Sequence, residues 1–202
     1  MHQKDCSLLS NLQKEEVNMR KYFLLFIFLL LVVAGCGPRE QSYDTNTEVP
    51  KDDPPFAALG QHWVIDKAEV LKEETIIDGD KICQSLQDDG VAEIAVLVIN
   101  GVKHPEEYAT HYGRWLKLGR KGLSTEGGNN GIVWLIRPEA ELKMTISVGR
   151  GLPRFTSSDY GEIMDGDAKE FLNFGNFDKG VIKIIEETNR KLREIYSPSK
   201  TK

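Results

Sequence analysis

The sequence is poor in cysteine and in net positive charge, and it is not hydrophobic overall; each of these excludes a class of protein. Three cysteines among 202 residues are too few for a small domain built on disulfide bonds. A formal net charge of −5 and a pI near 5.5 argue against a nucleic-acid-binding protein, which usually carries a basic face. A mean hydropathy of −0.36 excludes a protein with several membrane spans.

The familiar catalytic motifs are missing too. The chain has no G-x-S-x-G nucleophile elbow, no C-x-x-C and no H-E-x-x-H. Beyond residue 36 the histidines are His62, His104 and His111, and no two of them have the spacing of metal ligands. The sequence therefore predicts neither a standard covalent nucleophile nor a histidine-based metal centre.

One long hydrophobic run is present, at Phe23–Ala34. Its twelve residues are too few for a helix that crosses a bilayer, which needs about 20. They fit the hydrophobic region of a signal peptide, and Met19, Arg20 and Lys21 supply the basic segment before it. Residues 1–18 are polar and precede this pattern, so Met19 is a second candidate for the true start.

The residues Val33-Ala34-Gly35-Cys36 resemble the bacterial lipobox, in which an aliphatic and two small residues precede a cysteine. The resemblance implies that residues 1–36 are a lipoprotein signal and that Cys36 is lipidated and becomes the first mature residue. Buried acyl chains would then hold the protein to a membrane of the bacterial cell envelope. The alternative is a plain membrane anchor in which Cys36 has no role.

Removal of residues 1–35 takes away four basic and three acidic residues, which leaves 22 basic and 28 acidic residues and a formal charge of −6. Residues 37–60 hold four of the eight prolines and little apolar periodicity, which predicts a flexible to semi-extended tether. Residues 61–196 form the expected domain, and residues 197–202 a polar tail. Cys83 falls at helical spacing and is expected to be a core residue.

The spacing of apolar residues and the positions of glycine, proline and charged residues predict the helices and strands of this domain. A short strand is expected at 63–65, helices at 73–89, 105–117, 159–173 and 178–196, strands at 93–100, 132–136 and 142–148, and a glycine-rich loop at 119–131. Within the second helix, Tyr108, Tyr112 and Trp115 form an expected buried stripe. The order of elements predicts a layered α/β domain with a small mixed sheet. The loop matches no phosphate-binding motif and is expected to be a mobile surface loop rather than an anion cradle.

The motifs of this region, in their order, resemble the TPM domain of thylakoid-lumen proteins and bacterial envelope proteins. The matching residues are Val64–Asp66, Glu106–Ala109, Trp115, Gly119, Asn129–Gly131, Gly149, Gly151 and Thr156–Asp159. The resemblance implies a three-layer α/β/α domain and a shallow acidic cleft for calcium or magnesium. It also implies an acid-phosphatase activity for some members.

The sequence departs from the family where the acidic cleft is expected. The family's turn before the third strand usually carries two aspartates and an arginine, and Ala140, Glu141 and Leu142 stand there. The aspartate of the later helix cap is displaced by one position, with Ser158 at its place and Asp159 next to it. A hard cation takes several oxygen ligands. The remaining candidate ligands are Asp66, Asn130, Glu139, Glu141 and Asp159.

These observations are compatible with two alternative functions. The first is a non-catalytic binding or quality-control module for envelope or membrane proteins, which the lipid anchor and the altered acidic site favour. The second is a metal-assisted acid phosphatase, in which a calcium or magnesium ion would activate water and Arg150 or Arg154 would hold the phosphate.

Overall fold

The computed structural model describes residues 43–119 and 128–196. The expected signal sequence, Cys36 and the polar tail lie outside the described residues. Within the described ranges, four strands form one sheet in the order β1-β2-β3-β4. They are β1 (Val64–Asp66), β2 (Glu93–Val98), β3 (Gly131–Ile136) and β4 (Met144–Val148). The first three are parallel and β4 is antiparallel to β3, which confirms the expected small mixed sheet.

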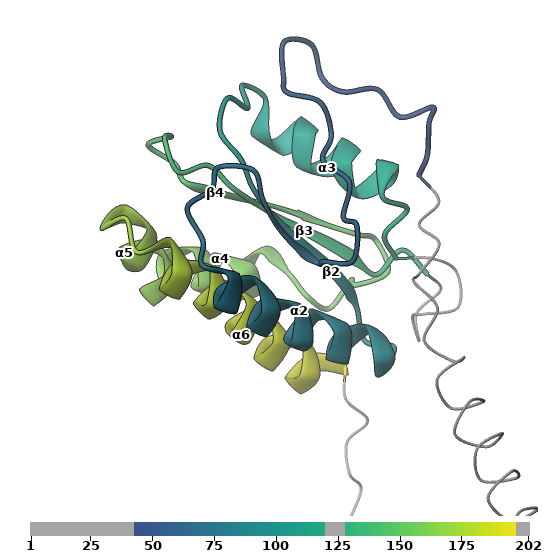
Figure 1. Ribbon diagram of the computed structural model, residues 1–202. Helices are drawn as coiled ribbons and strands as arrows, with labels where there is room; N and C mark the ends of the chain where they lie inside the picture. The colour runs from purple at the N-terminus through teal and green to yellow at the C-terminus, as the bar shows by residue number, and fades with distance from the viewer. Residues whose placement is uncertain (1–42, 120–127, 197–202) are drawn as a thin grey trace, which may run out of the picture. The chain divides into compact units, whose positions relative to one another are not determined.

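Helices cover both faces of this sheet. They are α2 (Glu73–Asp88), α3 (Pro105–Trp115), α4 (Ser157–Asp165), α5 (Asp167–Asn173) and α6 (Phe177–Tyr196). Neighbouring side chains of a strand point to opposite faces. On β3, Val133 meets Gly113 of α3, whereas Trp134 donates a hydrogen bond to Thr188 of α6 at 3.1 Å. Figure 1 shows α3 on one side of the sheet and α2 and α6 on the other, which confirms the three-layer α/β/α fold.

The two crossovers between the parallel strands have opposite hands. Strands β1, β2 and β3 are neighbours in chain order, so both connections step across the sheet in the same direction. Their helices, α2 and α3, lie on opposite faces (Figure 1). One connection is therefore left-handed, the rare hand for such a unit. Among the described helices, α3 alone covers its face of the sheet. A helix is about 10 Å wide and a four-stranded sheet is roughly 19 Å wide, so part of this face is left for other segments to cover.

The helix expected over residues 159–173 is wrong in one respect, because it is two helices. Helix α4 ends at Asp165 and α5 begins at Asp167, and Gly166 between them has extended backbone with φ −83° and ψ −162°. A side chain at Gly166 would come within 2.9 Å of the carbonyl oxygen of Glu162. The break thus sits at a residue without a side chain, and helical periodicity alone does not reveal it.

Residues 43–60, called the strap from here on, differ from the flexible tether expected over 37–60. The strap runs over α3 in Figure 1 and is joined to it by aromatic contacts. The ring of Tyr43 stacks on that of Trp115 with centroids 4.2 Å apart. The ring of Phe56 lies 5.2 to 5.8 Å from those of Tyr108, Tyr112 and Trp115. The prolines of the strap favour an extended backbone, which contacts the helix through a few separate side chains. Such a segment shows no regular spacing of apolar residues, so the sequence does not indicate that it is packed.

Polar contacts complete the attachment of the strap. The hydroxyl of Tyr112 donates to the carbonyl oxygen of Ala57 at 2.6 Å, and Ala57 and Leu59 belong to the core. The carboxylate of Asp53 accepts the backbone N–H groups of Lys103 at 2.6 Å and His104 at 3.3 Å. The strap therefore belongs to the folded domain, and the aromatic stripe of α3 is buried by the strap.

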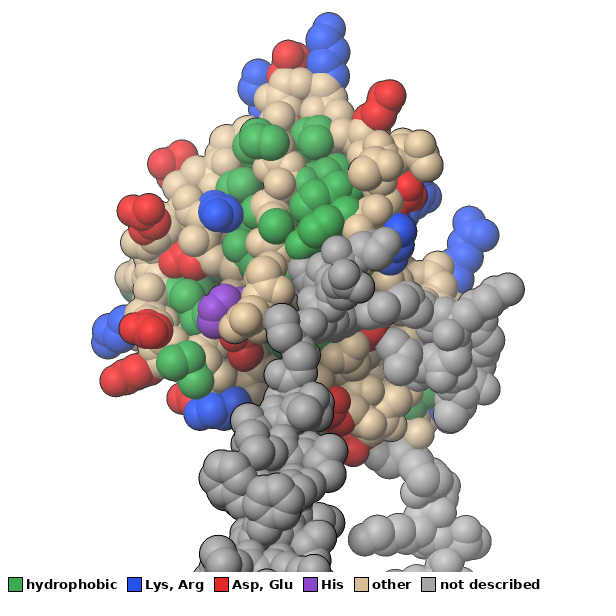
Figure 2. Space-filling model, turned by 45° about the vertical axis from the view of Figure 1, so that its right-hand side comes forward, with side chains coloured by type: hydrophobic (Ala, Val, Ile, Leu, Met, Phe, Trp, Pro, Cys, Tyr) green, Lys and Arg blue, Asp and Glu red, His purple; other side chains and the backbone are tan. Residues whose placement is uncertain are grey.

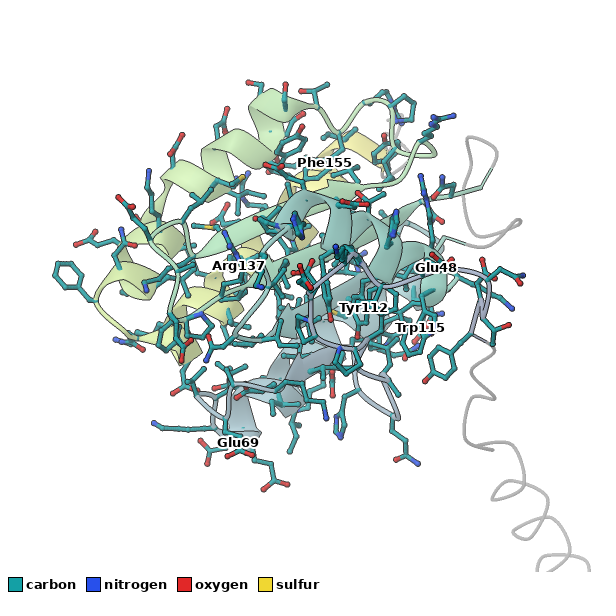
Figure 3. The ribbon with its side chains drawn as sticks, turned by 90° about the horizontal axis from the view of Figure 1, so that it is seen from above. Glu48, Glu69, Tyr112, Trp115, Arg137 and Phe155 are labelled. Carbon is teal, nitrogen blue, oxygen red and sulfur yellow. The ribbon has the colours of Figure 1, made fainter. Side chains whose placement is uncertain are left out.

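Figure 3, seen from the α3 side, shows Tyr112 and Trp115 side by side beneath the strap, and their ring centroids are 6.0 Å apart. On the opposite face of the sheet, Cys83 is fully buried, as expected for a core residue. In the described ranges, every helix is too short or too polar to span a membrane.

Candidate functional site

The five predicted metal ligands lie at two opposite edges of the sheet. Asp66 ends β1, and Glu139 and Glu141 follow β3, so these three lie at the carboxyl ends of the parallel strands. Asn130 precedes β3, and Asp159 follows β4, which returns to that same opposite edge. The six residues of β3 separate the edges by about 20 Å. The structure therefore does not bring the five residues together.

Asp66 is engaged in shaping the backbone after β1. Its carboxylate accepts three N–H groups, from Ala68 at 3.0 Å, Val70 at 2.8 Å and Leu71 at 2.6 Å. These bonds hold the turn that leads into α2. Both carboxylate oxygens of Asp66 are thus engaged by the backbone.

Asp159 also has a structural role, as part of a capping box at the start of α4. Its Oδ2 accepts the backbone N–H of Thr156 at 2.7 Å and the Thr156 hydroxyl at 2.8 Å. The hydrogen bond from the Thr156 backbone, followed by that from its hydroxyl, lowers the pKa of the Asp159 carboxyl. Asn130 is fully buried, and its amide nitrogen donates to the Val91 carbonyl at 3.0 Å.

Glu139 and Glu141 lie exposed in the turn between β3 and β4. The ammonium of Lys143 closes this turn by donating to the carbonyl oxygens of Pro138 and Ala140, at 2.5 and 3.2 Å. Across residues 43–119 and 128–196, no three His, Cys, Asp or Glu side chains are grouped as a metal site. The described residues thus do not fit the calcium or magnesium ion that the resemblance implies.

A cleft of about 590 Å³ lies between α3 and β4, at the edge of the sheet where β3 begins. Thr110 and Gly113 of α3 form one wall, and Val133 of β3 and Ser147 of β4 lie across from them. The hydroxyls of Thr110 and Ser147 are 3.2 Å apart and hydrogen-bonded. This cleft exists because α3 covers only part of its face of the sheet.

Among the described residues, three cationic side chains and one carboxylate line the cleft. Arg114 and Lys117 come from the end of α3, Arg150 from the segment after β4, and Asp44 from the strap. Hydrogen bonds to Asn46 and Thr47 lower the pKa of Asp44, with a smaller contribution from the charge of Lys117. The lining carries a formal charge of +2 in a chain of net charge −5.

Two of these cations stand out by their surroundings. Arg114 and Arg150 are exposed, and their side chains make no ion pair or hydrogen bond with the described residues. The other arginines of the described ranges do have partners. Arg137 and Arg193 donate hydrogen bonds, Arg190 pairs with two glutamates, and Arg154 lies over the ring of Tyr196 at 4.5 Å. On the face drawn in Figure 2, basic and acidic side chains are interspersed.

The floor of the cleft is formed by closely packed backbone. A side chain at Gly149 would collide with the Asn129 carbonyl oxygen, and one at Gly151 with that of Gly128. The N–H of Gly149 donates to Gly131 at 2.8 Å and that of Gly151 to Asn129 at 2.8 Å. The glycines thus allow two chain segments to touch, which explains the motif without an anion cradle. Residues 120–127 of the glycine-rich loop lie outside the described residues.

Glu93 was missed by sequence reasoning, which treated it as the first residue of an apolar strand. It is fully buried, and its Oε2 accepts the backbone N–H of Gly119 at 2.7 Å. Its Oε1 accepts the side-chain amide of Gln87 at 2.8 Å. Glu93 therefore fixes the point where the chain leaves α3 and passes along the cleft. A charged residue opening a buried run was the signal that could have revealed it.

Comparison with solved structures supports the fold. The N-terminal domain of a protein from P. gingivalis superposes with a TM-score of 0.52 at 16% identity, covering 65% of this chain and 82% of that one. The N-terminal domain of the cg2496 protein from Corynebacterium glutamicum gives a TM-score of 0.51 at 16% identity, covering 77% and 93%. At these identities the likeness concerns the fold alone.

Sequence comparison identifies the family. No curated protein matches the chain. The sequence model of the TPM domain matches residues 64–191, which is more than half of the 202 residues. This range begins with β1 and ends within α6, so it spans the whole sheet and the helices on both of its faces. The chain therefore belongs to the TPM domain family.

Proposed function

We propose that this protein is a non-catalytic binding module of the bacterial cell envelope, held at a membrane through Cys36. Its binding site is the cleft between α3 and β4, where it takes an anionic group of its client. The observation that supports this best is the lining of the cleft. Arg114, Lys117 and Arg150 supply charge, and Thr110 and Ser147 supply hydroxyls.

The same lining argues for binding rather than catalysis. Hydrolysis needs a general base, an activated nucleophile or a metal-bound water. Asp44, the one carboxylate among the described lining residues, accepts hydrogen bonds from Asn46 and Thr47. These bonds lower its pKa, which makes it a weaker base. His111 of α3 turns to the strap, where its Nδ1 lies 2.9 Å from the Glu48 carbonyl oxygen. Arginine pairs well with phosphate and carboxylate groups because its N–H donors match their two oxygens.

Anion binding can be tested by thermal unfolding in phosphate and in chloride at equal ionic strength. A ligand that binds the native state raises the unfolding midpoint. We expect phosphate to raise the midpoint of the protein, and to raise that of Arg114→Gln by less, because only the general stabilising effect of the salt then remains. Arg190→Gln is the matched control, because Arg190 is exposed on α6 and away from the cleft. Equal midpoints of the unmodified protein in both salts would contradict the proposal.

The anchor needs a separate test. Metabolic labelling with a fatty-acid analogue should mark the protein and should be lost in Cys36→Ala. Label that persists in this variant would refute lipidation at Cys36.

The second candidate function is the metal-assisted acid phosphatase. Two arginines of the cleft that have no partner within the described ranges favour it, since a phosphate ester needs such groups for binding, and the matching family model is named for a phosphatase. Its test is hydrolysis of p-nitrophenyl phosphate with calcium, with magnesium and with chelator. Hydrolysis that depends on the metal and is lost in Arg114→Gln would replace the binding proposal with this one. Hydrolysis at the level of buffer in all three conditions would exclude it.

A further inference from the structure

The strap brings the chain into the domain beside the cleft. Asp44, at its start, lines the cleft, and its backbone N–H donates to the carbonyl oxygen of Trp115 at 2.8 Å. Tyr43 stacks on the same residue. The side of the domain nearest the preceding chain is therefore the side with Arg114, Lys117 and Arg150.

The length of chain before the strap limits how far the cleft is from an anchor at Cys36. Tyr43 follows Cys36 by seven positions, with six residues between them. A chain of this length spans at most about 25 Å in any conformation. The sequence alone suggested a tether of 24 residues and a far longer reach. Because the strap is packed on α3, the cleft stays close to whatever surface carries the anchor.

We infer that the client of the cleft is the membrane itself, through the phosphate groups of anionic phospholipids. This inference rests on the proposed function, since it assigns the anionic group that the cleft takes. The mature chain carries a formal charge of −6 and is repelled as a whole by an anionic surface. Attraction must therefore be local, and the cleft, with its lining charge of +2, turns toward the bilayer. The lipid phosphates then pair with Arg114 and Arg150, which have no ion pair or hydrogen bond with the part of the chain that the structure describes.

A headgroup suits the cleft better than an acidic protein segment does. The anchor supplies the membrane surface at high local concentration without any further partner. Each basic residue close to an anionic membrane shifts binding about fivefold. A few cations suffice for orientation when a lipid anchor already provides attachment.

The test measures how accessible each of the two arginines is to a chemical reagent. The chain from residue 36 onward is attached through the Cys36 thiol to a maleimide lipid in vesicles; Cys83 is fully buried and stays unreacted. Vesicles contain either phosphatidylcholine alone or phosphatidylcholine with phosphatidylglycerol. Modification of each arginine by phenylglyoxal is then followed by mass spectrometry. We expect about fivefold slower modification of Arg114 and Arg150 with phosphatidylglycerol, and no change at Arg190.

A variant and a salt series support the interpretation. In Arg150→Gln, binding of the cleft to the anionic surface should weaken about fivefold, so Arg114 should lose most of its protection. Raised salt should remove the protection in the unmodified chain, since screening shortens the range of the attraction. Equal rates for Arg114 and Arg150 on the two kinds of vesicle would overturn the inference.

A second arm separates this inference from the proposed function. Inorganic phosphate is added to the same chain without vesicles. Protection of both arginines by phosphate, without protection by phosphatidylglycerol vesicles, overturns the membrane inference and leaves the anion-binding cleft in place. Protection by neither overturns both.

Discussion

The attachment of the strap to α3 makes a measurable contribution to stability. In Phe56→Ala, the ring that contacts Tyr108, Tyr112 and Trp115 is lost. Truncation of a fully buried phenylalanine costs about 3–5 kcal/mol, and aromatic pairs contribute about 0.5–1.5 kcal/mol each beyond their buried area. Because Phe56 is half-buried, we expect the free energy of unfolding to fall by about 2.5 kcal/mol.

Chemical denaturation followed by tryptophan fluorescence measures this loss, since Trp115 lies in the same cluster. For a domain of this size the thermal midpoint should fall by about 8 °C. Phe174→Ala is the matched control, because Phe174 is 80% exposed and its loss should change stability by less than about 0.5 kcal/mol. If Phe56→Ala were as stable as this control, the strap would not be part of the folded unit, and the reach argument for the membrane would fail with it.

Three further predictions concern single residues. Tyr112→Phe removes the hydrogen bond to Ala57 and should cost about 1–2 kcal/mol in urea unfolding. Burial raises the pKa of Tyr112, so its contribution should persist below about pH 10 and be lost as the pH rises further, which unfolding midpoints between pH 8 and 11 would show. Asp159→Asn should cost about 1 kcal/mol at pH 7 by weakening the cap on Thr156. Because the pKa of Asp159 is lowered, this difference should vanish as the pH falls below about 4; an unchanged difference at low pH would contradict the assignment. Gly149→Ala should destabilise the domain by more than about 2 kcal/mol, because its new methyl group would meet the backbone of the facing loop; a neutral effect on the thermal midpoint would refute the close contact.

The elements with a strong apolar period could be predicted from the sequence. The buried runs of β2 and β3 differ from prediction by two residues at most, and Pro105 does begin α3. Helix α6 begins at Phe177, one residue before the predicted start. These features follow from local residue types alone, and tertiary packing agrees with them.

The strap and the cleft could not be predicted in this way, because both depend on segments that are distant in sequence. Phe56 stands among prolines without any period, and only its contact with α3 reveals its role. Arg114 looks like an ordinary basic residue in the last turn of a helix, where it suits the helix dipole. Its place opposite Arg150 depends on how β4 pairs with β3. The five acidic and amide candidates fail to meet for the same reason, since chain order does not say which edge of a sheet a residue occupies.

The strap also has a consequence for the order in which the chain folds. The hydrogen bond between Tyr112 and Ala57 joins residues 55 positions apart, and the strap is the earlier of the two in the chain. During synthesis it therefore emerges before the helix it must cover, and its docking requires the closure of a long loop. Until then α3 presents Tyr108, Tyr112 and Trp115 to solvent. We therefore expect α3 to expose an aromatic face for as long as the strap is undocked, and such a face favours self-association.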